Sequence, residues 1–245
     1  MSTRRPIVRL EDVLPTGWID TFSRDHRRIA IGVDLGTTTK DKSNPTAVAV
    51  GQQVGLMNFA RVVLRFKNDD PAVLRALLLF ILEGLRGAGL SARRLCIDAT
   101  NERFFAVDLR REFAGKVPVE LIINSEKTTY GGEEMLWKAY LANLFINTID
   151  DGYLALPPGK WLQTDIRQTI KDRGTFVCDV LEDGGHGDCH RALENMLHGL
   201  VAKGGPVEAS PLPVGSYRAG RGVDPRRERG RLRSSYRSKG PRRPI

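Results

Sequence analysis

Ile29-Ala-Ile-Gly-Val-Asp-Leu-Gly36 is the stretch that decides the fold, and a second apolar run, Thr46-Ala-Val-Ala-Val50, follows it after a polar loop. The apolar residues around Asp34 are typical of a strand that is buried on both faces of a sheet. A carboxylate in such a strand is costly unless it is paired or binds a cation. Asp34 is therefore strained, salt-bridged or a metal ligand, and the rest of the sequence is needed to choose.

The other periodic segments predict an α/β fold that begins with three strands. Short links carrying Asn44-Pro45 and Gly55 are typical of an antiparallel meander. Asp69-Asp70-Pro71 predicts a helix start, and leucines at helical spacing follow it. The expected strands are 29–35, 46–51, 56–66, 94–99, 117–124 and 175–181, and the expected helices are 69–87, 101–113, 133–149, 161–170 and one that follows the glycine-rich stretch 184–188.

Three carboxylates end up close together in this arrangement. A right-handed crossover after the meander places the strand that ends at Asp98 beside the first strand and parallel to it. Asp34 and Asp98 then lie at neighbouring strand ends, and Asp188 arrives at the start of a late helix. Converging carboxylates repel one another, and oxygen-only ligands favour a hard ion such as Mg²⁺ or Mn²⁺.

Composition divides the 245 residues into three segments. We expect a lead-in over 1–28, one folded domain over 29–203, and a tail over 204–245 that is rich in Pro, Gly and Arg and disordered because it has almost no large aliphatic side chains. From Pro206 onward there are eleven Arg or Lys and three Asp or Glu, so most of the net charge of +9 lies in the tail. A basic tail suits a polyanion such as nucleic acid. Three cysteines predict no disulfide framework, and neither a signal peptide nor a membrane span is expected.

The motifs together resemble a known family. Ile31-Gly-Val-Asp34-Leu-Gly with Ala47-Val-Ala-Val50, Cys96-Ile-Asp98-Ala-Thr100, and His186-Gly-Asp188-Cys-His-Arg-Ala-Leu193 are similar to the three acidic motifs of the nuclease domain in the large terminase subunit of tailed phages. Asn124-Ser-Glu-Lys127 and Tyr153-Leu-Ala-Leu-Pro157 also resemble that family. The likeness covers Ile29 to about Leu200. It implies a ribonuclease H-like fold with a central mixed sheet of five or more strands flanked by helices.

The resemblance also implies an activity. That family cuts concatemeric double-stranded viral DNA during genome packaging, with two metal ions, Mg²⁺ or Mn²⁺, held by residues matching Asp34, Asp98 and Asp188. It implies action in the cytoplasm of the infected bacterial host, away from membranes, beside a packaging ATPase motor, a small terminase subunit and a portal protein. The sequence contains no G-x-x-x-x-G-K-[S/T] motif, so either this is an excised domain or the motor is encoded elsewhere. Asn101-Glu102 replaces the glycines that often follow the second motif.

Accessory roles fall on residues near these motifs. His186 could contact a phosphate, a water or the metal, and Asp183 is the reserve acidic ligand. Several basic residues could hold DNA phosphates: Lys40, Lys42, Lys127, Arg226 and Arg227. Each has an ordinary alternative, as a loop histidine, a solvated lysine or part of a solubilising tail.

Four other interpretations remain open. Asp34-Leu-Gly-Thr-Thr38 resembles the phosphate loop of actin-like and chaperone ATPases, although no second loop follows. A Holliday-junction resolvase would need Glu102 or Glu120 as a fourth acid. Cys178, His186, Cys189 and His190 could form a zinc set, in which the adjacency of the last two is awkward for tetrahedral ligation. An assembly factor that has kept the fold without metal binding is the fourth.

Overall fold

We analysed a computed structural model of the chain, which describes residues 13–36, 44–130, 132–172, 175–178 and 187–203. These residues belong to one compact unit, Met1–Val207, and a second unit, Glu208–Ile245, lies outside the described residues. The expected disorder of the tail therefore stays a prediction. No helix in the described part of the chain is both long and apolar enough to cross a membrane.

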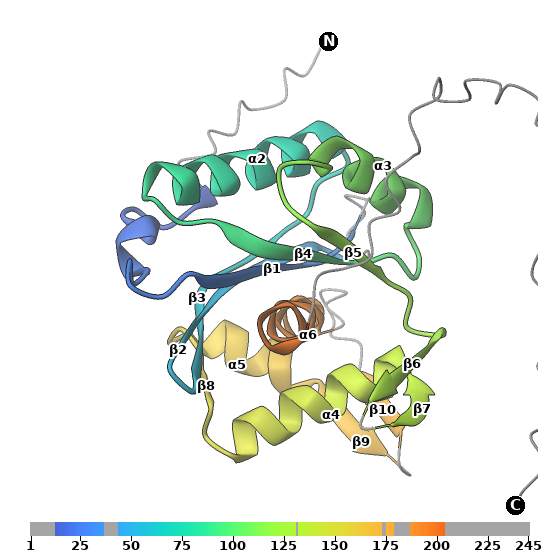
Figure 1. The fold of residues 1–245 in the computed structure, drawn as a ribbon. Helices are drawn as coiled ribbons and strands as arrows, with labels where there is room; N and C mark the ends of the chain where they lie inside the picture. The colour runs from blue at the N-terminus through green and yellow to red at the C-terminus, as the bar shows by residue number, and fades with distance from the viewer. Residues whose placement is uncertain (1–12, 37–43, 131, 173–174, 179–186, 204–245) are drawn as a thin grey trace, which may run out of the picture. The chain divides into compact units, whose positions relative to one another are not determined.

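A mixed six-stranded sheet forms the centre of the described unit (Figure 1). Its strand order is β5-β4-β1-β2-β3-β8. β1 is antiparallel to β2 and parallel to β4, which is itself parallel to β5. The strand bounds are β1 Arg28–Asp34, β2 Thr46–Val54, β3 Met57–Phe66, β4 Ala92–Asp98, β5 Val119–Ile122 and β8 Leu154–Ala155.

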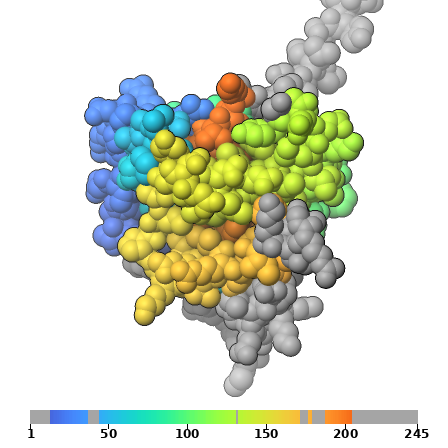
Figure 2. All heavy atoms as spheres, turned by 90° about the horizontal axis from the view of Figure 1, so that it is seen from below, coloured from blue at the N-terminus to red at the C-terminus, as the bar shows by residue number. Residues whose placement is uncertain are grey.

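Helices cover both faces of this sheet. α2 (Pro71–Gly87) and α3 (Arg103–Phe113) pack on one face, and α6 (Asp188–Val201) lies on the other (Figure 1). α2 begins at the expected place because the Asp70 carboxylate accepts a hydrogen bond from Ala72 N at 2.9 Å. α4 (Trp137–Asp150) and α5 (Lys160–Arg167) form a further layer over α6. Figure 2 shows that these two helices form much of the surface on that side.

Side-chain size explains why α6 can approach so closely. Along β1, the large residues Ile31 and Val33 belong to the core cluster under α2 and α3, whereas Ala30 belongs to the cluster around α6. Gly32 also faces α6, since a Cβ placed there would lie 2.1 Å from Ala192 O. Successive side chains of a strand point to opposite faces, so the small residues Ala30 and Gly32 both face α6. The helix can therefore lie almost in contact with the backbone of β1.

Most expected elements are confirmed, including the meander, the crossover and the mixed sheet. The lead-in contains a 3-10 helix, η1 (Trp18–Thr21). It packs on the body, because Trp18 is buried and lies against Gly84 of α2. The part of the expected strand 175–181 that lies beyond Cys178 is outside the described residues.

The two small hairpins differ from expectation. Residues 133–136 are not helical: they form β7 (Glu133–Leu136), which pairs with β6 (Lys127–Tyr130), and α4 begins only at Trp137. The predicted helix over 161–170 ends at Arg167 and is followed by β9 (Thr169–Asp172), which pairs with β10 (Thr175–Cys178). A strand of four residues has too short an alternation of apolar and polar side chains to be recognised in a sequence. The helical periodicity of the neighbouring segments therefore dominated the prediction.

Candidate metal centre

Asp34 and Asp98 lie side by side at the carboxyl end of the sheet. Val33 of β1 pairs with Ile97 of β4 in parallel register, so the next residue of each strand is an aspartate. Strand alternation points Asp34 to the same side as Gly32, which is the side covered by α6. Cys96 of β4 also faces α6, because a Cβ on Gly199 of that helix would lie 3.2 Å from the Cys96 sulfur. Asp98 lies two residues further along β4 and therefore points to the same side.

The N-terminus of α6 brings Asp188 to the same end of the sheet. α6 runs antiparallel to β1: Ala192 and Met196 lie over Gly32, and Gly199 lies over Ala30. Its first residue, Asp188, is therefore at the end where β1 finishes. Asn195 fixes this docking, because its Nδ2 donates to Val33 O at 3.1 Å.

The electrostatics of Asp34 show that the three carboxylates interact. The pKa of Asp34 is raised well above its ordinary value, first by burial and then by the negative charges of Asp98 and Asp188. Asp98 is 8% exposed and Asp188 is 1% exposed, so little solvent screens their repulsion. The three acids predicted from the sequence are thus brought together in the fold.

Two polar groups orient the Asp98 carboxylate. Its Oδ1 accepts from Thr100 N and its Oδ2 accepts from Asn124 Nδ2, each at 2.8 Å. Asn124 follows the end of β5, and its own N–H donates to Thr100 Oγ1 at 3.0 Å. The motif that begins at Asn124 was visible in the sequence, but its hydrogen bond to Asp98 was not.

A second set of contacts fixes the start of α6. Gly187 has a left-handed backbone, with φ of 69°, and its N–H donates to Gln168 Oε1 at 2.8 Å. Asp165 of α5 accepts from His190 N at 3.0 Å and forms an ion pair with Arg65 at 3.3 Å. Burial raises the pKa of Asp165. Sequence reasoning missed these residues, since α5 has the composition of a solvent-facing helix.

A buried ion pair lies one turn further along α6. Arg191 contacts Glu194, and Glu194 also accepts from His190 Nε2 if that nitrogen carries the proton, at 3.1 Å. Burial opposes ionisation of Glu194, yet the charges of Arg191 and His190 leave its pKa below the ordinary value. The pKa of Arg191 is raised despite burial, first by Glu194 and then by Asp98 and Asp34. Neither residue was among the predicted site residues.

The donor set of this centre fits a hard divalent cation. Three carboxylates from β1, β4 and α6 offer only oxygen atoms, which Mg²⁺ and Mn²⁺ prefer. The pKa of Asp34 is raised first by burial and then by repulsion from Asp98 and Asp188, and a bound cation would offset that repulsion. Asp34, Asp98 and Asp188 are the residues that would hold such an ion.

Most accessory predictions fall outside the described residues: His186, Asp183, Lys40, Lys42, Arg226 and Arg227. Lys127 is described and lies on β6, where its Nζ is 2.9 Å from Glu134 Oε2. Both of these side chains are about two-thirds exposed, so this is a surface ion pair.

Two members of the alternative zinc set, Cys189 and His190, are buried and in contact with other groups of the protein. Cys189 is fully buried, and burial raises the pKa of its thiol. His190 lies with Nε2 near Glu194 and Nδ1 at 3.3 Å from Ile166 O. Both ring nitrogens of His190 therefore lie against groups of the protein, whereas His186 lies outside the described residues.

A second polar cluster, formed by Cys96, Glu120 and His198, has ligand atoms within 4.8 Å of one another. Arg94 occupies this place, because its Nη1 lies 2.6 Å from Glu120 Oε2 and 3.4 Å from His198 Nε2. Tyr140 closes the cluster through a 3.1 Å contact with His198 Nδ1. A divalent cation would have to displace the buried guanidinium of Arg94. The positive charge of Arg94 therefore takes the place that a cation would have in this cluster. Glu120 is thereby committed to this cluster and is not a fourth acid of the metal centre.

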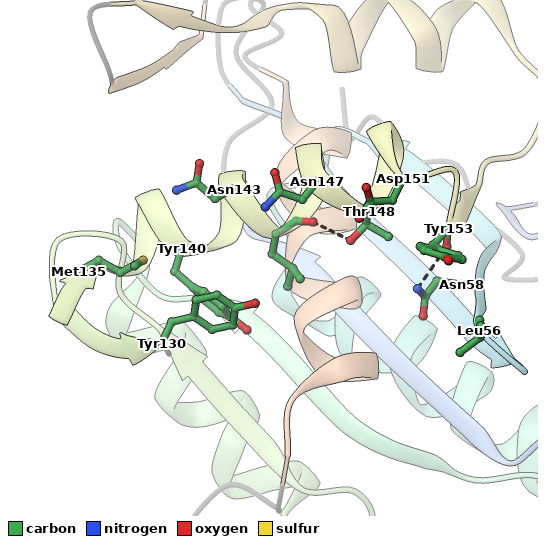
Figure 3. Close-up of a pocket in the computed structure, with 11 residues that line it drawn as sticks. Leu56, Asn58, Tyr130, Met135, Tyr140, Asn143, Asn147, Thr148, Asp151 and Tyr153 are labelled. Atoms are coloured by element: carbon green, nitrogen blue, oxygen red, sulfur yellow. Dashed lines mark hydrogen bonds between the residues drawn. The ribbon is translucent and has the colours of Figure 1, made fainter. Parts of the chain in front are cut away.

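A groove of about 590 Å³ lies beside α4 and is not lined by any of the three acids. Figure 3 shows Asn143, Asn147 and Thr148 of α4 along it, with Tyr130 near one end and Tyr153 near the other. Its lining combines apolar and amide side chains with Asp151 and three tyrosines, Tyr130, Tyr140 and Tyr153. Asp34 and Asp98 lie elsewhere, at the carboxyl end of β1 and β4.

Gly36 argues against the nucleotide interpretation of the first motif. Its N–H donates to Thr46 Oγ1 at 3.1 Å, and a Cβ on Gly36 would lie 2.2 Å from Asn44 O. The amide that would hold a phosphate in an ATPase loop is therefore used within the chain. Thr37 and Thr38 lie outside the described residues.

Comparison with solved structures identifies the fold class. No protein-family profile and no curated protein matches the sequence. The large terminase nuclease of thermophilic phage G20c with bound magnesium aligns with a TM-score of 0.52 at 12% identity, over 74% of this chain and 94% of that one. The large terminase of a second thermophilic bacteriophage aligns with a TM-score of 0.50 at 13% identity, over 73% of this chain and 43% of that one. The human cytomegalovirus terminase nuclease domain aligns at 15% identity with a TM-score of 0.49, over 76% and 89%.

The chain has a ribonuclease H-like α/β fold. Within that class, its fold is the one seen in the nuclease domains of large terminases, as the resemblance of its motifs predicted. It matches less than half the length of the second phage's large terminase.

Proposed function

We propose that this chain is a metal-dependent endonuclease that cleaves concatemeric double-stranded viral DNA during genome packaging. The observation that carries the proposal is the meeting of Asp34, Asp98 and Asp188 on the α6 side of the sheet, where burial, and then the charges of Asp98 and Asp188, raise the pKa of Asp34. Carboxylates that repel one another in a closely packed fold suit a site completed by cations. The proposal of nuclease activity is supported by the resemblance of the three motifs and by the fold shared with large terminase nucleases.

The residues of the chain bind and orient in this reaction. The chemistry that a pair of Mg²⁺ or Mn²⁺ ions would supply here is activation of a water and stabilisation of the leaving 3′-oxygen in an in-line displacement. Asp34, Asp98 and Asp188 would hold the ions, and Asn124 with the Thr100 N–H keeps the Asp98 carboxylate in position. No side-chain nucleophile is needed, because water adds to phosphorus as the bond to the 3′-oxygen breaks.

The proposal includes partners and place of action. DNA bound through its phosphates is cut with little sequence preference, since phosphate contacts carry no base information. Because the activity belongs to packaging, we place the chain with an ATPase motor, a small terminase subunit and a portal protein in the cytoplasm of an infected bacterium. The basic segment 204–245 is proposed to add affinity for DNA.

A plasmid-cleavage assay tests the proposal. Supercoiled plasmid is incubated with the protein in Mn²⁺, in Mg²⁺ and in chelator, beside an ATP-hydrolysis assay on the same preparation. We expect nicked and linear DNA only with metal, and loss of cleavage in Asp34→Asn, Asp98→Asn and Asp188→Asn. Asp108→Asn, on the exposed surface of α3, is the matched control. Unchanged cleavage in the three site variants, or ATP hydrolysis without cleavage, would overturn the proposal.

A further inference from the structure

Arg191 has surroundings that no structural role requires. Pairing with Glu194 requires only that an arginine lie about one turn from it on α6. The guanidinium of Arg191 is also close enough to the metal centre for the charges of Asp98 and Asp34 to act on it. The interaction is mutual, since the charge of Arg191 opposes the rise in the pKa of Asp34.

Helix geometry explains the placement. Asp188, Arg191 and Asn195 are separated by three and four residues, so they share one stripe of α6. Asn195 of this stripe donates to the carbonyl of Val33, directly beside Asp34. The stripe therefore faces the carboxyl end of β1, and Arg191 lies between two residues that touch or complete the site.

Glu194 holds Arg191 ready for an anion. Glu194 is 0% exposed, accepts from Arg191 and contacts His190 Nε2, whereas the Arg191 side chain is 20% exposed. Only Nη1 is engaged among the hydrogen bonds of the described residues. A guanidinium carries five N–H donors in a planar fork, so most of them stay available on the side open to solvent.

We propose that Arg191 binds a phosphate of the DNA strand at the acidic centre, with Glu194 as the residue that positions it. This rests on the proposed nuclease function. A phosphodiester approaching three carboxylates meets repulsion, and a fixed arginine beside them offsets it and supplies bidentate hydrogen bonds. The same positive charge opposes binding of cations to Asp34 and Asp98.

The proposal predicts effects of opposite sign for one substitution. Arg191→Gln should bind Mn²⁺ more tightly than the wild type in the absence of DNA, by roughly threefold, because a neighbouring like charge is removed. The same variant should bind a short DNA duplex about tenfold more weakly in Ca²⁺. A merely structural role would weaken both, since loss of packing would disturb the whole centre.

The experiment combines calorimetric titration of Mn²⁺ with fluorescence anisotropy of a 20-base-pair duplex in Ca²⁺. Arg110→Gln, on the exposed side of α3, is the matched control and should behave as the wild type. Arg191→Lys keeps the charge and loses the fork, so Mn²⁺ binding should stay unchanged while DNA binding weakens several-fold. This variant also decides the matter if Arg191→Gln does not fold.

Asp34→Asn distinguishes failure of the proposed nuclease function from failure of the proposed role of Arg191. If Asp34→Asn binds Mn²⁺ as the wild type does, the proposed function itself is overturned. If Asp34→Asn loses Mn²⁺ but both Arg191 variants bind DNA as the wild type does, only the role of Arg191 is overturned.

Discussion

Asp34→Asn should make the metal-free protein more stable while removing its response to metal. In the wild type the Asp34 carboxylate is destabilised by burial and by Asp98 and Asp188. Neighbouring strands lie about 4.8 Å apart, and two unit charges about 5 Å apart repel by about 3 kcal/mol at an effective dielectric constant of about 20. The positive charge of Arg191 offsets part of this repulsion. We therefore expect the free energy of unfolding of metal-free Asp34→Asn to exceed that of the wild type by about 1–2 kcal/mol at pH 8.

The gain should depend on pH in a defined direction. Because the pKa of Asp34 is raised on folding, the folded wild type retains a proton that the unfolded chain releases. Its stability therefore falls as the pH rises from the unfolded pKa, about 3.9, toward the folded pKa. The asparagine variant lacks this loss, so its advantage should be near zero at about pH 4 and largest above the folded pKa of Asp34.

Thermal unfolding in chelator between pH 4 and pH 8 measures this effect. For a chain of this size, about 1 kcal/mol shifts Tm by about 2–4 °C, so the variant should melt roughly 2–8 °C higher at pH 8. With Mn²⁺ at about 100 times Kd, the wild type should gain about 2.7 kcal/mol and the variant almost nothing. Asp108→Asn should melt as the wild type does. A variant less stable than the wild type at pH 8, or a gain that does not change with pH, would refute this reasoning.

Three further predictions concern packing, orientation and the tail. Gly32→Val should destabilise the fold by about 3 kcal/mol or more in chemical denaturation, because its Cβ would lie 2.1 Å from Ala192 O. The control Gly87→Ala, whose Cβ meets nothing within 4 Å, should be neutral or slightly stabilising. Equal effects of the two substitutions would contradict the close approach of α6. Asn124→Ala should weaken Mn²⁺ binding by about 10–100-fold in calorimetry with the fold retained, since Asp98 loses its 2.8 Å partner; unchanged binding would show that Asn124 does not orient the ligand. Deletion of residues 206–245 should weaken DNA binding at low salt and flatten its salt dependence without changing Mn²⁺ affinity, and identical salt titrations of the two forms would exclude a DNA-binding tail.

The sequence predicted the parts of the site that belong to long periodic elements. Asp34 and Asp98 were recognisable because each ends a buried strand, and the crossover rule made those strands neighbours. The position of Asp188 required more: α6 had to lie against β1, and the small side chains of Ala30 and Gly32 that permit this are meaningful only once the partner helix is known.

The supporting residues could not be predicted in the same way. Asp165, Arg191 and Glu194 resemble the solvent-facing charges of any amphipathic helix, and only tertiary packing shows Asp165 and Glu194 to be buried and Arg191 to be partly buried. Asn124 is a loop residue whose partner lies 26 residues away. Long-range polar contacts of this kind leave no period in the sequence, whereas the hydrophobic core does.

The most direct test of the metal centre is anomalous scattering from crystals of the protein soaked in Mn²⁺. We expect manganese peaks bounded by the carboxylates of Asp34, Asp98 and Asp188, about 2.0–2.3 Å from their oxygens. Manganese bound at Cys96, Glu120 and His198 instead, or no peak beside the three aspartates at saturating Mn²⁺, would contradict it.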